Sequence, residues 1–396
     1  MEILVISFLL TSICICDLEA QNDEQLHPDY FLNITELIEK YGYPVEIHEV
    51  TTEDEYMLTL FRIPHGRQES GVNSKPIFLM HGLFGQAENY VVAGMFNASL
   101  AYLLADNGFD VWLGNTRGNM HGRKHKRLDP DTKSFWNFSW HEIGIYDLPA
   151  SIDYVLERTR TPKLYYIGHS QGGTAFYIMN SLKPNYQQKI ILASLLAPAG
   201  YFNNFDNPLL NPIVKFLKNM FPVLINTMYE FPPKSMGLTT FFANVCEENI
   251  FRDFCLRMYN VFVGYDSGGI NKVLLPLLLK NLPTVCSKQI FHYGQAIISG
   301  HFRPWDYGKQ KNLEVYGRDV PPDYPIKSIK VPIAIYYTLG DNLVYPKDIE
   351  KISEDLPNCV RRYLIKKPTF THIDFITDGA ELLNIPVLEF LKNFNG

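Results

Sequence analysis

The chain has 396 residues, of which 46% are hydrophobic and 20% charged, with a net charge of −6 and a pI of about 6.0. This composition is typical of a globular protein with enough apolar material for a large core. The slight acidic excess gives no support for nucleic acid as a partner, or for electrostatic attachment to a membrane.

The first 20 residues are typical of a secretory signal peptide. An apolar stretch at 3–16 is followed by small residues such as Ala20, which offer a cleavage point. The stretch is short for a membrane span, so no transmembrane anchor is expected after cleavage. An uncleaved anchor is the alternative, because Glu2 stands where a basic residue is usual. We expect a secreted protein, or one in the lysosome or another lumen of the secretory route.

Three N-glycosylation sequons support the secretory route. They begin at Asn33, Asn97 and Asn137. Each sequon alone is common by chance, so the argument depends on their agreement with the amino-terminal pattern.

Four of the six cysteines lie outside the predicted signal. A secretory compartment permits disulfides. Cys246 and Cys255 are nine residues apart and flank an amphipathic stretch, which makes them the favoured pair. Cys286 and Cys359 are compatible with free thiols or with a second bridge. No cluster of Cys and His residues indicates a metal site, and no cofactor is expected.

Short apolar runs alternate with amphipathic stretches over most of the chain. This pattern predicts an α/β fold with a mainly parallel sheet and helices on both faces. The predicted strands are 56–63, 76–80, 109–114, 164–168, 190–198, 331–340 and 360–365. The predicted helices include 33–42, 87–108, 147–159, 173–182 and 380–394.

The alternation stops between residues 201 and 330, where long apolar runs are broken by Pro and Lys. We expect a mostly helical cap and lid insertion over the carboxyl ends of the strands, where open α/β sheets bind ligands. The expected division is therefore a signal peptide at 1–20, a first part of the core at 21–200, the cap at 201–330 and a second part of the core at 331–396.

The stretch 163–180 reads KLYYIGHSQGGTAFYIMN and places Ser170 between a strand and a helix. Gly-x-Ser-x-Gly alone is a weak signal, since such a serine also occurs in ordinary glycine-rich loops. In the α/β-hydrolase arrangement, however, the nucleophilic serine lies on a sharp strand-to-helix turn flanked by glycines. The flanking pattern thus favours Ser170 as a nucleophile, which needs a base to remove its proton.

The chain order of a hydrolase triad of this kind is Ser, then Asp or Glu, then His. Of the eleven histidines, only His372 follows the strand predicted at 331–340, so it is the expected base. Asp341 stands at the carboxyl end of that strand and is the expected acid, which holds the imidazole tautomer. The rivals by chain order are Asp348, Glu350 and Asp374.

An oxyanion hole needs two backbone N–H groups directed at the developing charge. Gln171, directly after the nucleophile, is expected to supply one. The loop after the strand IFLM begins His81-Gly82-Leu83, and Leu83 is expected to supply the other.

Several segments together resemble the acid lipase family of α/β hydrolases, which contains gastric and lysosomal acid lipases and secreted insect lipases. They are FLMHGLFGQAENYV, GFDVWLGNTRGNMHGRKH, FWNFSWHEIGIYDLPASIDYVL, YYIGHSQGG and FTHIDF, and the resemblance covers nearly the whole mature chain. It implies a lipase that hydrolyses triacylglycerol or sterol esters at a lipid–water interface. It also implies a triad of Ser170, Asp341 and His372, an oxyanion hole at Leu83 and Gln171, and a Cys246–Cys255 disulfide in the cap.

The chain departs from the family pattern at a few positions. Glu55 stands where the family usually has Gly, so a positive φ there is expected to be strained. Gly173 replaces a Thr and is expected only to loosen the start of its helix. These departures leave the expected chemistry intact. The two alternatives to a lipase are an esterase for small soluble esters and a catalytically idle lipid-binding protein on a hydrolase fold.

Overall fold

The computed structural model describes residues 27–68, 75–96, 98–232, 255, 257, 277–279, 282–377 and 380–394. The predicted signal at 1–20, Asn97 and Cys246 lie outside these residues. Within the described ranges, no helix is both long enough and apolar enough to cross a membrane.

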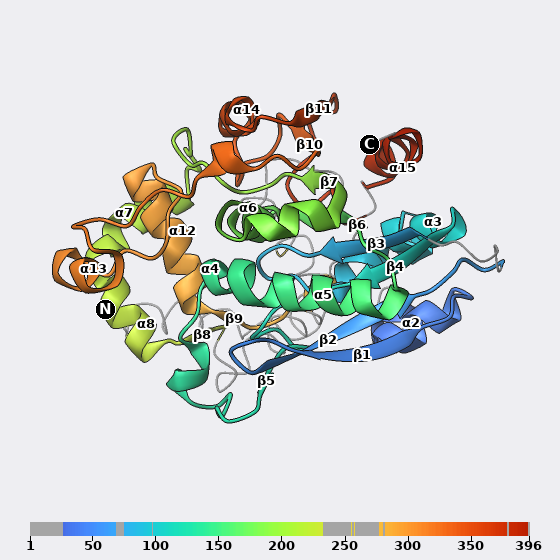
Figure 1. Ribbon diagram of the computed structural model, residues 1–396, viewed down its shortest axis with the longest axis horizontal. Coiled ribbons are helices and arrows are strands. Elements are labelled where there is room, and N and C mark those ends of the chain that lie inside the picture. The colour runs from blue at the N-terminus through green and yellow to red at the C-terminus, as the bar shows by residue number, and fades with distance from the viewer. Residues whose placement is uncertain are drawn as a thin grey trace, which may run out of the picture.

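The centre of the molecule is a nine-stranded sheet with the order β1-β2-β4-β3-β6-β7-β10-β11, and β5 pairs with β2 (Figure 1). The strands from β4 to β11 along this order run parallel, whereas β1 and β5 pair with β2, and β2 with β4, in antiparallel fashion. The bounds are β1 Glu46–Thr51, β2 Tyr56–Ile63, β3 Lys75–Met80, β4 Phe109–Leu113, β5 Lys124–His125, β6 Leu164–His169, β7 Ile190–Leu196, β10 Ile333–Thr338 and β11 Cys359–Ile365. The mainly parallel sheet predicted from the sequence is confirmed.

All seven predicted strands are present, with ends that differ by a few residues. Two strands of this sheet, β1 and the two-residue β5, were not predicted from the sequence. Strand β1 has charged residues at Glu46 and Glu49 and only two buried positions. It forms because every one of its residues pairs with β2, from Glu46 opposite Arg62 to Thr51 opposite Met57. Pairing with a hydrophobic neighbour thus replaces the apolar run that marks the other strands.

The helices alternate with the strands in the parallel part of the sheet. Their bounds are α2 Ile34–Lys40, α3 Leu100–Asp106, α4 Trp140–Glu142, α5 Leu148–Thr159, α6 Gln171–Leu182, α7 Leu210–Leu217, α8 Phe221–Thr227, α12 Ser287–Ser299, α13 Lys309–Tyr316, α14 Pro346–Asp355 and α15 Glu381–Asn393. A π-helical segment, Ile143–Asp147, joins α4 to α5.

The single helix predicted over 87–108 is wrong. The chain instead makes 3-10 turns at Ala87–Tyr90 and Val92–Phe96 before α3 begins at Leu100. Ser99 caps α3, because its hydroxyl accepts a hydrogen bond from the N–H of Tyr102. A local side-chain cap therefore sets the helix start that periodicity alone did not show.

Helices cover both faces of the sheet (Figure 1). On one face, strand side chains such as Leu79 and Val111 pack in a buried cluster with α3 and α15. On the other, alternate side chains such as Phe78 and Trp112 pack with α5, α6 and α14. The alternation of neighbours between the two clusters follows from the two-residue period of a strand. The parallel sheet is thus buried on both sides and forms a fixed platform for the loops at its edge.

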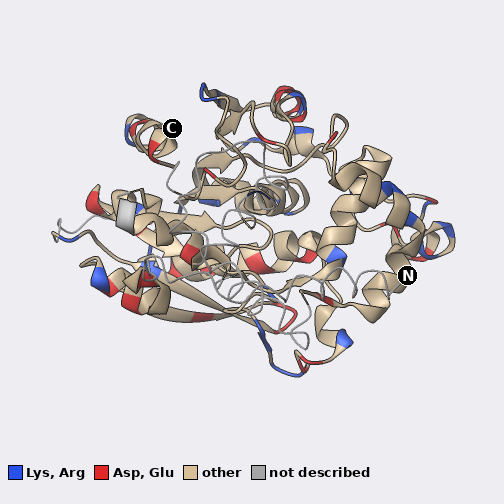
Figure 2. Ribbon diagram, turned by 180° about the vertical axis from the view of Figure 1, so that it is seen from behind, with Lys and Arg blue, Asp and Glu red and all other residues tan. Residues whose placement is uncertain are grey.

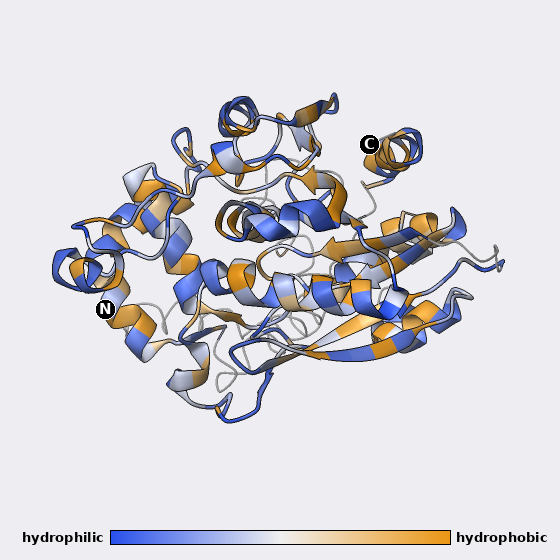
Figure 3. Cartoon of the chain, in the orientation of Figure 1, coloured by the Kyte–Doolittle hydropathy of each residue, from blue (hydrophilic) through white to orange (hydrophobic). Residues whose placement is uncertain are grey.

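The chain between β7 and β10 contains α7, α8, α12 and α13, which gather at one end of the molecule (Figure 1). A short antiparallel pair, β8 Glu230–Phe231 with β9 Val285–Cys286, lies in the same part of the chain. A small apolar cluster of Phe221, Phe291 and Trp305 binds α8 to α12 and the loop before α13. In Figure 3, hydrophobic residues recur along α7 and α8.

Candidate active site

Ser170 lies on a sharp turn between β6 and α6. The strand ends at His169, Ser170 has φ +50° and ψ −111°, and the helix begins at Gln171. A positive φ is rare for a residue with a side chain, so the surrounding structure must hold this conformation. The turn directs the chain from a buried strand into a buried helix within one residue, as the sequence context of Ser170 predicts.

Two glycines allow α6 to start against neighbouring backbone. A Cβ at Gly172 would lie 2.4 Å from the carbonyl oxygen of Met80, and a Cβ at Gly173 would lie 2.4 Å from Cβ of Pro198. The expectation that Gly173 only loosens the helix start is therefore wrong. Its missing side chain lets α6 pack against the segment that follows β7.

His372 and Asp341 lie together at the end of the sheet. Nδ1 of His372 donates a hydrogen bond of 2.7 Å to Oδ2 of Asp341, and both side chains are buried. The other carboxylate oxygen of Asp341 accepts from the N–H groups of Leu343 and Val344, each at 2.8 Å. With both oxygens engaged, the carboxylate fixes the imidazole orientation and its Nδ1–H tautomer.

Two of the three rival carboxylates have other partners, and the third is exposed. Asp348, at the start of α14, accepts hydrogen bonds from the backbone and side chain of Asn204. Glu350 is exposed on the same helix. Asp374 accepts from the N–H and the hydroxyl of Thr371 at 2.6 and 2.9 Å, and so shapes the loop that carries His372.

His169 connects the turn at Ser170 to the loop of His372. Its Nε2 lies 2.9 Å from the carbonyl oxygen of His372, and the two ring centroids are 4.9 Å apart. Burial holds the pKa of His169 well below its ordinary value, and the nearby His372 lowers it further. A neutral His169 can donate from Nε2 and adds no charge beside His372. Sequence reasoning assigned it no role, because its partner is a backbone atom 203 positions away.

The loop after β3 approaches the same turn. A Cβ at Gly82 would lie 3.0 Å from Cβ of Ser170, so only glycine fits there without displacing a neighbour. Within the described part of the chain, the N–H of Leu83 donates to no other group. Gln171 is the first residue of α6, so its N–H has no partner inside the helix. Two unpaired backbone donors therefore flank Ser170.

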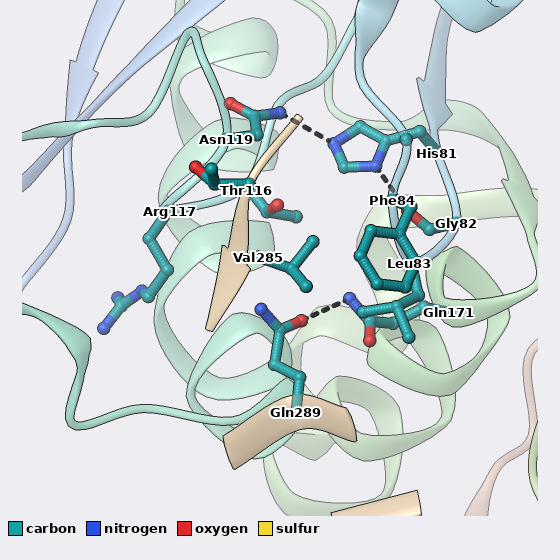
Figure 4. A pocket seen from close by; sticks show the side chains of 12 residues that line it. His81, Gly82, Leu83, Phe84, Thr116, Arg117, Asn119, Gln171, Val285 and Gln289 are labelled. Carbon is teal, nitrogen blue, oxygen red and sulfur yellow. Dashed lines mark hydrogen bonds between the residues drawn. The ribbon is translucent and has the colours of Figure 1, made fainter. Parts of the chain in front are cut away.

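A cavity of about 10 Å³ lies between the loop after β3, the first turn of α6 and β9 (Figure 4). This volume is room for about one water molecule. At its edge, Nε2 of Gln171 donates a 2.7 Å hydrogen bond to Oε1 of Gln289 on α12. His81, Arg117 and Asn119 also line the cavity. Sequence reasoning gave none of these side chains a role, although the segment NTRGNMHG, which carries Arg117 and Asn119, is part of the family resemblance.

The remaining predicted residues are two sequon asparagines and three cysteines. Asn33 and Asn137 are exposed. Cys255 is disulfide-bonded, whereas Cys286 and Cys359 are free thiols.

Glu55 has φ +73°, as its position in a turn that usually takes Gly predicts.

Basic and acidic residues are both spread over the molecule rather than gathered by sign (Figure 2). Among the described residues, no group of three or more His, Cys, Asp or Glu side chains is arranged to hold a metal ion.

Comparison with known proteins gives consistent matches over most of the chain. Residues 34–94 match the partial alpha/beta-hydrolase lipase region, and residues 75–378 match the alpha/beta hydrolase fold. Lipase 1 of Drosophila melanogaster is 41% identical over 89% of this chain and 77% of its own length. Human gastric triacylglycerol lipase is 36% identical over 88% of this chain and 87% of its own.

A solved structure, naproxen esterase from Bacillus subtilis, has a TM-score of 0.50 at 15% identity. It covers 93% of this chain and 99% of its own. At that identity the likeness extends to the fold alone.

Proposed function

Because this chain belongs to the acid lipase family of α/β hydrolases and is a carboxylic ester hydrolase, we propose that it cleaves neutral-lipid esters through a Ser170–His372–Asp341 triad. One observation carries the proposal: the 2.7 Å hydrogen bond from His372 to Asp341, beside a strained serine turn. Neither feature is needed for folding alone, since a positive φ at serine costs free energy.

In the first half of the reaction, Nε2 of His372 takes the hydroxyl proton of Ser170 while Oγ attacks the ester carbonyl carbon. The carbonyl oxygen becomes an oxyanion, which accepts hydrogen bonds from the N–H groups of Leu83 and Gln171. The imidazolium then gives its proton to the alcohol oxygen, the ester C–O bond breaks, and the acyl group stays on Ser170. Asp341 stabilises the imidazolium and keeps Nδ1 protonated throughout.

In the second half, water replaces the alcohol. His372 takes a proton from the water molecule, whose oxygen attacks the acyl carbon, and the same two backbone donors hold the second oxyanion. Collapse of this intermediate returns the proton to Oγ of Ser170 and releases the carboxylic acid. His169 supports both halves by holding the backbone of His372 close to the serine turn.

The proposal for a lipid rather than a small soluble ester depends on α7 and α8. Four apolar side chains, Ile213, Phe216, Met220 and Val223, are between 42% and 80% exposed along this helical segment. They are three or four residues apart and so share one side of it. Between residues 210 and 227 the charged residues are Lys215 and Lys218, with no acidic residue. Such an exposed apolar stripe is suited to a lipid surface.

We further propose that residues 1–20 are a cleaved secretory signal, that 201–330 form a cap, and that the mature protein is secreted. The exposed side chains of Asn33 and Asn137 are accessible as an N-glycan requires. The disulfide at Cys255 is consistent with an oxidising compartment, and Cys246 is its proposed partner.

Two measurements test this function. An alkyl organophosphonate is expected to label Ser170, and Ser170→Ala is expected to abolish hydrolysis while the circular dichroism spectrum stays unchanged. Retained hydrolysis in Ser170→Ala contradicts the triad. Absence of labelling at Ser170 would favour the lipid-binding alternative.

A substrate series separates the lipase from the soluble-ester esterase. The rate on tributyrin is expected to rise as its concentration passes the solubility limit, and triacylglycerol or cholesteryl ester emulsions are expected to be hydrolysed. A rate that saturates below the solubility limit, with no hydrolysis of emulsions, would favour the esterase.

A further inference from the structure

A chain of buried polar side chains lies directly behind the Leu83 donor. Nδ1 of His81 lies 2.8 Å from the carbonyl oxygen of Gly82, and Nε2 of the same ring lies 3.2 Å from Nδ2 of Asn119 (Figure 4). His81 and Asn119 are both almost fully buried. A carbonyl oxygen only accepts, so Nδ1 must carry the proton, and Nε2 must then accept from the amide of Asn119.

The bond to Gly82 sets the direction of the Leu83 N–H. In a trans peptide, the C=O of one residue and the N–H of the next point in opposite directions. When His81 holds the carbonyl of Gly82 on one side, the N–H of Leu83 is directed to the other side. Gly82 lies so close to Ser170 that an added Cβ would be 3.0 Å from Cβ of Ser170. The histidine thus orients an oxyanion donor without touching the substrate.

Asn119 has hydrogen-bond partners that only an amide can satisfy. Its Nδ2 donates to His81 and, at 2.9 Å, to Oδ1 of Asn115, while its Oδ1 accepts from the N–H of His121 at 3.0 Å. Asn115 accepts in turn from the N–H of Ala87 and donates to the carbonyl of Thr59. Both polar atoms of the Asn119 side chain have hydrogen-bond partners, so the amide cannot turn over. Its Nδ2 therefore always faces Nε2 of His81 as a donor, which fixes the His81 tautomer.

The loop that carries Asn119 is itself fixed by a buried ion pair. Arg117 donates from its backbone N–H and its guanidinium to the buried carboxylate of Asp147. Its remaining guanidinium nitrogens bind Asp54 at 2.6 and 2.7 Å. The position of Asn119 therefore depends on the segment between α4 and α5 and on the turn before β2, not on the loop alone.

We propose that His81, with its tautomer set by Asn119, is a positioning residue that holds the Leu83 peptide in the oxyanion hole. This inference rests on the proposed function, because it explains how one of the two oxyanion donors in that function, the Leu83 N–H, is held in place. Gly82 also accepts a 3.1 Å hydrogen bond from the N–H of Gly85, so part of the loop geometry survives without His81.

The charged and titratable groups around His81 favour its neutral form. Burial lowers the pKa of His81 to about 4, and nearby His121 acts in the same direction. His121 is paired with Glu88 at 2.7 Å. His169 lies next to Gly82, on the same side of that residue as Ser170. Arg117 lines the same cavity but is engaged by its two carboxylates.

The test uses Asn119→Asp, which keeps the shape but replaces the donor with an acceptor. A neutral His81 would then protonate Nε2 and leave Nδ1 unable to donate to Gly82. We expect kcat on soluble p-nitrophenyl butyrate to fall about 10–100-fold at neutral pH, with little change in KM. An alkyl trifluoromethyl ketone, whose serine adduct carries an oxyanion, is expected to lose affinity by a similar factor.

The pH dependence distinguishes positioning from a general loss of structure. The carboxylate introduced by Asn119→Asp favours a doubly protonated His81, which regains its bond to Gly82, so the ratio of variant to wild-type kcat is expected to rise as the pH falls. His81→Phe keeps a ring but has no hydrogen-bond donor, so its ratio of variant to wild-type kcat should stay low at every pH. In the His81→Phe background, Asn119→Asp should have little additional effect on kcat.

A matched control is Asn384→Asp on α15, a buried amide that donates to the carbonyl of Ala98. It is expected to lower the melting temperature without changing kcat or ketone affinity. A pH-independent ratio for Asn119→Asp together with wild-type ketone affinity would overturn the positioning role. Retained activity in Ser170→Ala would instead overturn the proposed function, so the two failures are distinguishable.

Discussion

Helices α6 and α7 are both apolar, but they relate to the rest of the molecule in opposite ways. From Gln171 to Ser181 every residue of α6 is buried, between the sheet and neighbouring helices. In α7 no residue is fully buried, and Phe216 is 80% exposed. One helix is fixed by contacts on all sides, whereas the other presents part of its apolar surface outward.

Under the proposed function, this difference separates the region that performs the chemistry from the region that contacts the substrate. The residues that need geometry within a fraction of an ångström, such as Ser170 and the Gln171 N–H, are fixed by the buried helix and its strand. Large apolar substrates need exposed area rather than fixed geometry, which α7 and α8 provide. Changes in the two regions should therefore have different consequences, and four predictions test this contrast.

The largest effect is expected at the buried site from Asp341→Asn. The amide keeps the shape but stabilises the wrong tautomer of His372, so kcat should fall by about 10⁴-fold. The melting temperature should change little by comparison. Steady-state kinetics on a soluble ester measure the loss, and equal activity of variant and wild type would show that Asp341 is not the acid of the triad.

The second prediction concerns how the free energy of unfolding depends on pH. His81 is buried and its pKa is lowered from 6.5 to about 4, so the unfolded chain takes up its proton first as the pH falls. Above pH 6.5 this destabilisation by His81 is absent. As the pH falls from 6.5 to 4, it lowers the free energy of unfolding by about 3 kcal/mol. His292 on α12, whose pKa burial lowers well below its ordinary value, acts in the same sense.

Urea denaturation at several pH values measures this slope. In His81→Phe the slope between pH 6.5 and 4 should be smaller, whatever the variant's stability at pH 7. An unchanged slope would show that His81 is not buried in its neutral form.

The third prediction concerns the packing of α6. In Gly172→Ala the new methyl group meets the carbonyl of Met80 at 2.4 Å, so the start of α6 and the end of β3 must separate. We expect a loss of about 2 kcal/mol in unfolding free energy, together with lower kcat, because β3 leads into the Leu83 loop. Denaturant unfolding and esterase kinetics check both, and wild-type stability would contradict the close contact.

The smallest effect is expected on the exposed helix. Phe216→Asp should leave stability and soluble-ester activity unchanged but lower activity on a triacylglycerol emulsion about 10-fold, since one exposed aromatic is lost from the lipid contact. Leu382→Asp on α15 is the matched control, because Leu382 is also an exposed apolar residue. An equal effect of both variants on the emulsion would remove the special role of α7.

The sequence predicted the parts of the fold that have a local signal. The strands around Ser170, Asp341 and His372 have apolar runs, and chain order left one histidine for the base, so the three residues of the proposed triad could be named before any geometry. The supports of the site have no such signal. His81 acts on its neighbour's carbonyl, and Asn119 acts through a side-chain contact across 38 positions, so neither role can be recognised from spacing.

Two errors have the same physical origin. The predicted helix at 87–108 failed because Ser99 caps a later start, a local hydrogen bond that outweighs apolar periodicity. Gly173 was expected to be harmless, but the contact that requires it is with Pro198, which lies beyond the next strand. In both cases a specific atom-to-atom contact decided what composition and periodicity could not.

The strands that flank the long segment between β7 and β10 are neighbours, with Ala193 opposite Ile333 and Leu196 opposite Tyr336. Because β7 and β10 are parallel, the chain leaves the sheet at the carboxyl end of one strand and returns at the amino end of its neighbour. Such a segment can be lengthened, shortened or exchanged without re-threading any strand, and Ser170, Asp341 and His372 all lie outside it. Under the proposed function, substrate choice and hydrolytic chemistry can accordingly be altered independently, by evolution or by grafting this segment between relatives.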